Sequence, residues 1–185
     1  GNIVVGLDSK GNTYLFPNNV DDGSFDGCGI LNMKLARMGS STNIPDSLFK
    51  DYVQFSCDDV GQNNMVILKA WDVNGNSNSC MSNVEVQDKH GPVITCPADV
   101  TIDCSAVFTG MDLTQYGTAT VYDACGAEMT ELDSVYTLSA CRTGTIVRTF
   151  SGTDGVNIVT CKQTITVNNN NIFDPVRDVV FPKDY

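Results

Sequence analysis

Short runs of β-branched, aromatic and other apolar residues, each bounded by turn residues, recur along the first half of the chain. These runs cover residues 3–7, 13–16, 30–37, 52–56, 65–71 and 81–87. Such runs predict β-strands, whereas a helical spacing of apolar positions is nowhere sustained. In the run 30–37, Leu31, Met33 and Leu35 alternate with Asn32, Lys34 and Ala36, which predicts a strand with one face in a core. The pattern indicates an all-β fold.

The second half of the chain repeats landmarks of the first half in the same order. Asp26-Gly27-Cys28-Gly29 recurs as Asp123-Ala124-Cys125-Gly126, Cys57 before the run ending in Trp71-Asp72 recurs as Cys141 before the run ending in Thr153-Asp154, and Cys80 recurs as Cys161. An internal repeat of short strands predicts two tandem β-sandwich modules. We place them at residues 1–89 and 90–168. Residues 169–185 are then a linker and the first strand of a following module, or a strand donated to a neighbour.

Composition narrows the classes of partner. The chain has 185 residues, with 11 Lys and Arg against 22 Asp and Glu, and a formal net charge of -11. This anionic surface argues against nucleic acid as a partner. No apolar run approaches the ~18 residues of a membrane helix, so membrane insertion is not expected. The start at Gly1, without an initiator Met or a signal segment, suggests a processed chain or an excised fragment.

Eight cysteines accompany a single histidine, His90. Zinc sites need closely paired ligands such as Cys-x2-Cys, and this spacing does not occur. An even number of widely spaced cysteines instead predicts four disulfides and an oxidising compartment outside the cytoplasm.

Three motifs give the chain a family resemblance: Cys96-Pro97-Ala98-Asp99-Val100-Thr101, the two Asp-x-Cys-Gly turns, and the stretch from Asp72 to Cys80. With them the chain resembles tandem hyalin-repeat (HYR) or related immunoglobulin-like modules of giant surface adhesins exported by the bacterial type IX secretion system. The resemblance implies a non-enzymatic sandwich at the cell surface, used for spacing and adhesion. It also implies neighbouring modules or filament subunits as partners, and possible contacts with surface glycans or other cells.

The strand order of such a sandwich, together with this resemblance, implies a set of disulfides. The expected pairs are Cys28–Cys80, Cys125–Cys161, Cys104–Cys141 and, as a bond between modules, Cys57–Cys96. A competing assignment joins Cys96 to Cys161 and leaves Cys57 to pair outside the fragment.

Acidic loops make calcium a candidate ligand, because Ca²⁺ takes six to eight oxygens. The candidate ligands are Asp22, Asp26, Asp72 and Asn74 at one end of the first module, and Asp88, Asp123 and Asp154 at the junction of the modules. The alternative is that these residues only form tight turns, since Asp and Asn side chains satisfy turn backbone without a metal. Ser47 and Ser134 lie in Asp-Ser-apolar triplets, which resemble bacterial O-glycosylation sites.

No catalytic constellation stands out, because His90 lies beside Gly91-Pro92 with no candidate nucleophile nearby in the sequence. The sequence therefore favours an extracellular structural or adhesive repeat segment that acts as a disulfide-stiffened spacer. The alternative is a glycan- or protein-binding module attached to a secreted hydrolase.

Overall fold

The computed structural model describes residues 1–39 and 44–170, which form two compact units. The first unit contains Gly1–His90 and, in addition, Asp123–Gly126; the second contains Gly91–Tyr122 and the described residues from Ala127 to Asn170. Each unit is an immunoglobulin-like β-sandwich, so the predicted fold class is confirmed. The predicted C-terminal strand lies beyond Asn170, outside the described residues. No helix in the described ranges is long and apolar enough to cross a membrane.

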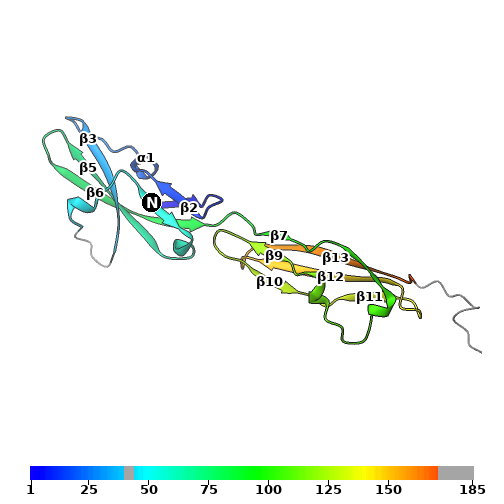
Figure 1. Ribbon diagram of the computed structural model, residues 1–185. Coiled ribbons are helices and arrows are strands. Elements are labelled where there is room, and N and C mark those ends of the chain that lie inside the picture. The colour runs from blue at the N-terminus through cyan, green and yellow to red at the C-terminus, as the bar shows by residue number, and fades with distance from the viewer. Residues whose placement is uncertain (40–43, 171–185) are drawn as a thin grey trace, which may run out of the picture. The chain divides into compact units, whose positions relative to one another are not determined.

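The first unit contains a four-stranded and a two-stranded sheet (Figure 1). The larger sheet has the order β1 (Asn2–Gly6), β6 (Ser77–Gln87), β5 (Asn64–Asp72) and β3 (Ile30–Arg37), and the smaller sheet pairs β2 (Asn12–Leu15) with β4 (Val53–Ser56). Short helices α1 (Pro17–Val20), η1 (Asp46–Leu48) and η2 (Cys57–Asp59) lie in the connections. All six strands match runs predicted from the sequence.

The alternation expected in β3 holds only in part. Leu35 is fully buried in the core between the sheets, where it packs with residues such as Phe55 and Val66. Ala36 is also buried, because Phe49 covers the opposite face of the sheet. Leu31 is 68% exposed, since a register shift between Ile30 and Asn32 forms a bulge that releases it from the core-facing row.

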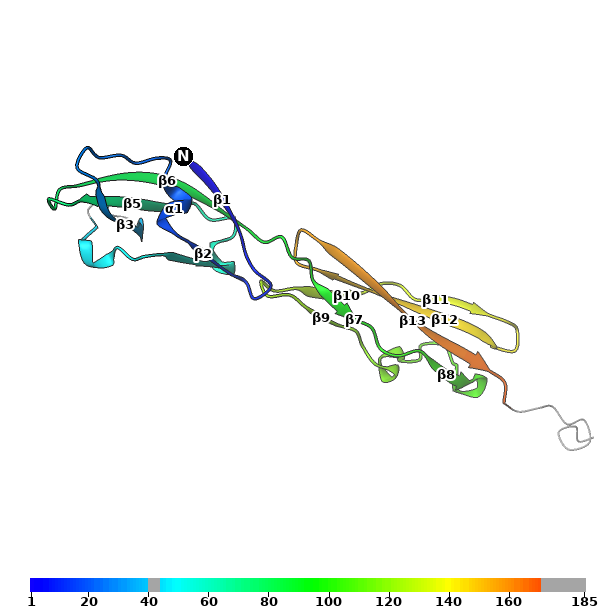
Figure 2. The same cartoon turned by 90° about the horizontal axis from the view of Figure 1, so that it is seen from above.

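The second unit has an equivalent antiparallel pair of central strands, joined by a connection of the same length as in the first unit (Figure 2). Its larger sheet has the order β10 (Glu128–Glu131), β12 (Gly144–Thr153), β13 (Ile158–Asn168) and β8 (Val100–Asp103), with β11 (Val135–Leu138) also paired to β12; a smaller sheet pairs β7 (Val93–Thr95) with β9 (Thr120–Tyr122). Short helices η3 (Cys104–Ala106) and η4 (Leu113–Tyr116) complete the unit. Strands β10 and β11 together occupy the position that β3 alone fills in the first unit.

In both units the first strand of the larger sheet pairs in parallel with the last strand. Strand β1 pairs with β6 from Asn2↔Asn83 to Gly6↔Gln87, and β8 pairs with β13 from Val100↔Ile165 to Asp103↔Asn168. The two sequence repeats therefore share one structural feature: the first and last strands of the larger sheet run side by side in the same direction.

A buried arginine organises the interior of the second unit. Arg148 has 0% exposure and donates Nε and Nη2 hydrogen bonds to the Glu131 carboxylate, at 2.7 and 2.9 Å. Its Nη1 donates to the Gly117 carbonyl and to Gln163 Oε1, at 2.7 and 2.8 Å. The equally buried Gln163 donates in turn to the carbonyl oxygens of Ala98 and Tyr116. The network joins β12 and β13 to the loops that precede β8 and β9.

Replacing Arg148 with alanine should destabilise the chain by about 3 kcal/mol, because Glu131 and Gln163 would lose their buried partner. Denaturant unfolding would show this as a lower midpoint. Lys162→Ala is a matched control, since Lys162 is a basic, exposed residue of the neighbouring strand β13. An Arg148→Ala variant as stable as the control would contradict a structural role for the network.

Candidate functional site

The structure contains two disulfides, Cys57–Cys125 and Cys96–Cys161. The predicted pairs Cys57–Cys96 and Cys125–Cys161 are therefore wrong, whereas the competing assignment of Cys96 to Cys161 is confirmed. The physical reason for the Cys96–Cys161 pairing is the parallel register between β8 and β13. Val100 lies opposite Ile165, so the same register brings Cys96, four residues before β8 begins, to Cys161 of β13. Cys57 pairs with Cys125, not outside the fragment.

The other four cysteines are free thiols in the structure. Cys28, Cys80 and Cys141 are exposed and Cys104 is half-buried, so the predicted bonds Cys28–Cys80 and Cys104–Cys141 do not form in it. Two disulfides, instead of the expected four, hold the described chain.

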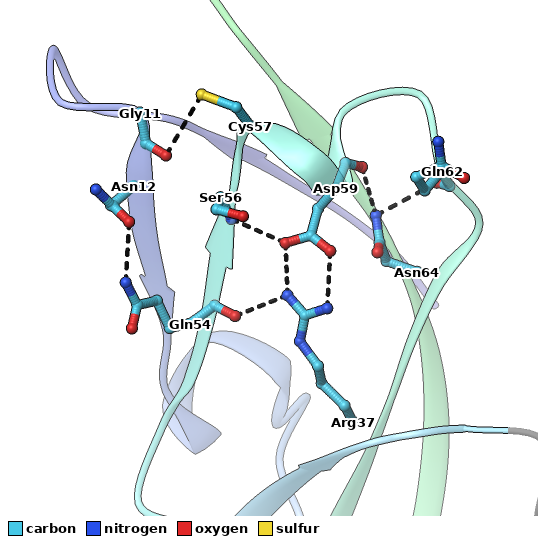
Figure 3. Close-up of polar contacts among 9 residues, drawn as sticks. All are labelled: Gly11, Asn12, Arg37, Gln54, Ser56, Cys57, Asp59, Gln62 and Asn64. Atoms are coloured by element: carbon cyan, nitrogen blue, oxygen red, sulfur yellow. Dashed lines mark hydrogen bonds and ion pairs between the residues drawn. The ribbon is translucent and has the colours of Figure 1, made fainter. Parts of the chain in front are cut away.

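The Cys57 sulfur, which is bonded to Cys125, lies against Gly11 in the turn between β1 and β2. Figure 3 shows Cys57 and Gly11 side by side. The Cys57 sulfur is 3.8 Å from the Gly11 carbonyl oxygen; because it is bonded to Cys125 it carries no proton, and the approach is a van der Waals contact. Gly11 has φ +73°, and a Cβ there would lie 2.5 Å from the Cys57 sulfur and 3.4 Å from Ala124 Cβ. Glycine is thus needed both for the backbone conformation and for the space.

Gly11→Ala should lower the melting temperature more than Gly61→Ala. Gly61 has nearly the same φ, +72°, but nothing lies within 4 Å of a Cβ there. Both variants carry the left-handed strain of about 1 kcal/mol, and only Gly11→Ala adds a clash with Cys57. Calorimetry of both proteins, oxidised and reduced, measures the difference. Equal melting temperatures for the two oxidised variants would disprove the close packing.

An ion pair fixes the turn that carries Cys57 (Figure 3). Arg37 on β3 donates Nη1 and Nη2 to the Asp59 carboxylate at 2.7 and 2.6 Å, and Nη2 also donates to the Gln54 carbonyl. Asp59 Oδ2 accepts the Ser56 N–H at 2.8 Å. The guanidinium lies over the Phe55 ring, 4.3 Å from its centroid. Hydrogen bonding by Arg37, above all, lowers the pKa of Asp59 from its usual value, although burial opposes the shift.

A lowered folded-state pKa means that Asp59 stabilises the fold above the unfolded pKa of about 3.9, and that this contribution is lost as the pH falls through the folded-state pKa. Asp59→Asn should therefore destabilise the chain by about 2 kcal/mol at pH 7 and by less in acid. Denaturant unfolding from pH 7 down to pH 2 measures this. Asp58→Asn, at the exposed neighbour, makes the same change of charge as a control. A penalty for Asp59→Asn that is independent of pH would contradict this role.

Two of the candidate calcium ligands instead cap hairpins. The Asp72 carboxylate accepts the N–H groups of Asn74 and Asn76 and the Asn76 side-chain amide. Asp154 does the same with Val156 and Asn157. The side-chain bond from the asparagine is the main cause that lowers the pKa of each aspartate. These carboxylates satisfy turn backbone, as the alternative reading of the sequence proposed.

The structure brings one predicted ligand pair together. Oxygens of Asp88 and Asp123 lie within 4.8 Å of each other and of Cys125 Sγ, all in the first unit. The Cys125 sulfur is in a disulfide and offers no thiolate. Asp154 is not a member of this group. Two carboxylates alone fall short of the six to eight oxygens that Ca²⁺ takes, so calcium at this pair stays a prediction.

A cavity of about 420 Å³ opens in the first unit, lined by residues of the loop before β3 and of the β5–β6 hairpin, including Phe25, Asp26, Asp72 and Asn76. Of the ligand set predicted at this end, Asp26 and Asp72 line the cavity, whereas Asp22 and Asn74 are exposed and do not. Cavities of this size accept small ligands. The sequence pattern placed Asp26 and Asp72 at the same end of the first module but did not predict a cavity, because its walls come from loops and strands far apart in the chain.

The two predicted glycosylation residues differ in accessibility. Ser47 is exposed on η1, and Ser134 is half-buried just before β11. O-glycosylation stays a prediction for both.

No protein-family model matches the chain, and no curated protein matches it. The HYR resemblance therefore stays a hypothesis. Solved structures that align with it include titin domains Z1Z2 in complex with telethonin, at 11% identity, 92% of this chain, 93% of that chain and a TM-score of 0.38. Protocadherin gamma B2 extracellular cadherin domains 1–5 align at 14% identity over 93% of this chain and 39% of that chain, with a TM-score of 0.32. Sidekick-1 immunoglobulin domains 1–4 align at 10% identity over 90% of this chain and 48% of that chain, with a TM-score of 0.30. The chain spans less than half the length of the last two.

Proposed function

We propose that this chain is a segment of an extracellular, non-enzymatic array of sandwich modules, and that it acts as a disulfide-stiffened spacer in a bacterial surface adhesin or filament. Neighbouring modules or filament subunits are its partners. The observation that carries the proposal is the pattern of the two disulfides, Cys57–Cys125 and Cys96–Cys161. Along the sequence, Cys96 lies between the two cysteines of the first bond, and Cys125 lies between the two cysteines of the second. Disulfides persist in the oxidising environment outside the cytoplasm.

The sheet topology supports a role under tension. Force applied to the two ends of either unit pulls its terminal strands in opposite directions. Because β1 pairs with β6 in parallel, and β8 with β13, that force shears all the ladder hydrogen bonds of a pair together. In the second unit the Cys96–Cys161 bond joins β13 to the segment just before β8, four residues before this ladder, so in the oxidised chain the covalent bond carries the force and the β8–β13 ladder is loaded only after reduction. A spacer needs this resistance, whereas an enzyme does not.

The buried network and the exposed histidine fit the same role. Arg148 and Gln163 donate all their hydrogen bonds to groups inside the second unit, which leaves them no part in binding a substrate. His90 is exposed, and its backbone N–H donates to Asp88. We assign neither group a catalytic function.

Single-molecule pulling from the two termini tests the spacer. In the oxidised chain, the path from Cys57 to Cys161 through both bonds contains only the segment between Cys96 and Cys125. Reduction should add about 75 residues of extensible chain, or about 250 Å at ~3.4 Å per residue. A Cys96→Ser variant should already show part of this gain before reduction. Equal contour lengths with and without reductant would contradict the crosslinked spacer.

The cavity beside Phe25 favours a second candidate function, the binding of a small polar ligand such as a glycan. Hydroxyl and amide side chains, among them Ser77 and Asn78, line it together with apolar residues. Trp71 also lines the cavity, and its ring packs edge-on against Phe49. Glycan-array binding by the intact chain that is abolished by Asn76→Ala would favour this function over the spacer.

A further inference from the structure

Cys80 and Cys161 occupy equivalent positions in the last strand of the two units. Cys80 lies opposite Leu68 of β5, and Cys161 lies opposite Phe150 of β12. Four positions after each cysteine, the last strand pairs in parallel with the first strand of its sheet, β6 with β1 and β13 with β8. The bonding states differ, because Cys161 is bonded to Cys96 whereas Cys80 is an exposed free thiol. The second unit therefore shows what lies at this position when the cysteine is bonded.

In the second unit the segment around β7 occupies it, along a path that three contacts define. Before β7 begins, a Cβ at Gly91 would lie 3.4 Å from Asn157 Cβ in the β12–β13 hairpin. Along its whole length, β7 pairs antiparallel with β9. Directly after it, Cys96 bonds to Cys161. The segment therefore runs from the hairpin to the cysteine of β13 and is held by β9 on the way.

In the first unit the cavity lies along the equivalent path. Asn76 has the position of Asn157, since each donates its side-chain amide to the aspartate that caps its hairpin. Asn76 and Cys80 both line the cavity. The residues at the two ends of the path are therefore both present at the cavity.

One wall of the cavity corresponds to β9. Ser24 and Phe25 line the cavity directly before the Asp-x-Cys-Gly turn at Asp26. Strand β9 ends directly before the equivalent turn at Asp123. Residues 23–25, however, are exposed and form no strand, and the Phe25 backbone N–H and C=O have no hydrogen-bond partner among the described residues. The backbone is thus unpaired where the second unit has a paired strand, and unpaired exposed backbone can accept an added strand.

The apolar surface beside this backbone is also less covered than in the second unit. There, Val121 of β9 packs so closely on Gly152 of β12 that a Cβ at Gly152 would lie 2.6 Å from Val121 Cγ2. Ala70 has the position of Gly152, two residues after the residue opposite the cysteine. Ala70 is half-buried and lines the cavity, whereas Gly152 is buried. With Phe25 90% exposed, the cavity combines open apolar surface with unpaired backbone.

We propose that this cavity binds an extended segment like that around β7, an apolar pair followed by one further residue and Cys-Pro, supplied by a neighbouring module of the array. The segment adds as a strand to residues 23–25, its apolar side chains cover Ala70, and its cysteine bonds to Cys80. Two thiols each lose a proton and an electron to form that bond, and a small-molecule disulfide such as glutathione disulfide is reduced to two thiols. The inference rests on the proposed function as an array, and it fills the cavity with protein in place of a glycan.

The test adds a synthetic peptide with the sequence of residues 91–99 to the full chain and measures amide hydrogen exchange. With serine in place of its cysteine, the peptide should slow exchange within residues 23–25, because their N–H groups gain partners in an antiparallel ladder. A peptide of the same composition in scrambled order is the control and should leave this exchange unchanged.

The covalent step is measured with the cysteine form of the peptide in a glutathione redox buffer. Peptide mapping should find the added peptide on Cys80. Cys80→Ser should lose this adduct but still show slower exchange with the serine peptide. Cys28→Ser, which removes another exposed thiol of the first unit, should keep both.

Unchanged exchange within residues 23–25, or adducts on Cys28 as often as on Cys80, would overturn the strand site. Slower exchange that rises with chain concentration without any peptide would assign the cavity to a second copy, and slower exchange with an oligosaccharide but not with the peptide would assign it to a glycan. Either result overturns the proposed occupant. A chain that fails to bind the peptide but gains contour length on reduction in the pulling experiment remains a spacer without this site.

Discussion

The Cys57–Cys125 bond is the constraint on which the arrangement of the chain depends. It joins the turn before β5 to a turn that lies between β9 and β10 in the sequence, and it places Asp123–Gly126 in the first unit. Gly11, Ala124 and the carboxylates of Asp88 and Asp123 come together around it. Short sandwiches bury only a modest core, so a covalent bond at this position supplies order that apolar packing alone does not provide.

Each unit supports its disulfide with a charged group held by fixed partners. In the first unit the Arg37–Asp59 pair fixes the turn that carries Cys57. In the second, Arg148 and Gln163 fix the loop between Cys96 and β8 through the Ala98 carbonyl. Such groups stabilise only when every donor finds an acceptor, and no buried side-chain polar atom in the described ranges lacks a partner. The polar interior therefore specifies one arrangement of strands around each bond.

Some structural features of the sequence repeat are the same in both halves of the chain, and others differ. The Asp-x-Cys-Gly turns of the two sequence repeats have the same hydrogen bonds, and both units have parallel terminal strands. The connection into the central strand differs: β4 and η2 precede β5, whereas a tight turn joins β11 directly to β12. Cys57 and Cys141 consequently have corresponding positions in different local structures, one bonded and one free.

The sequence by itself determined the fold class, the six strands of the first unit and the internal repeat, because strand periodicity and turn residues are local properties. It also placed Asp88 and Asp123 near each other. Only the tertiary structure decided the disulfides, the burial of Arg148 and the exposure of Leu31. Cysteine pairing depends on the register between β8 and β13 and on which unit holds the turn at Asp123, and both are set by contacts between residues more than sixty positions apart.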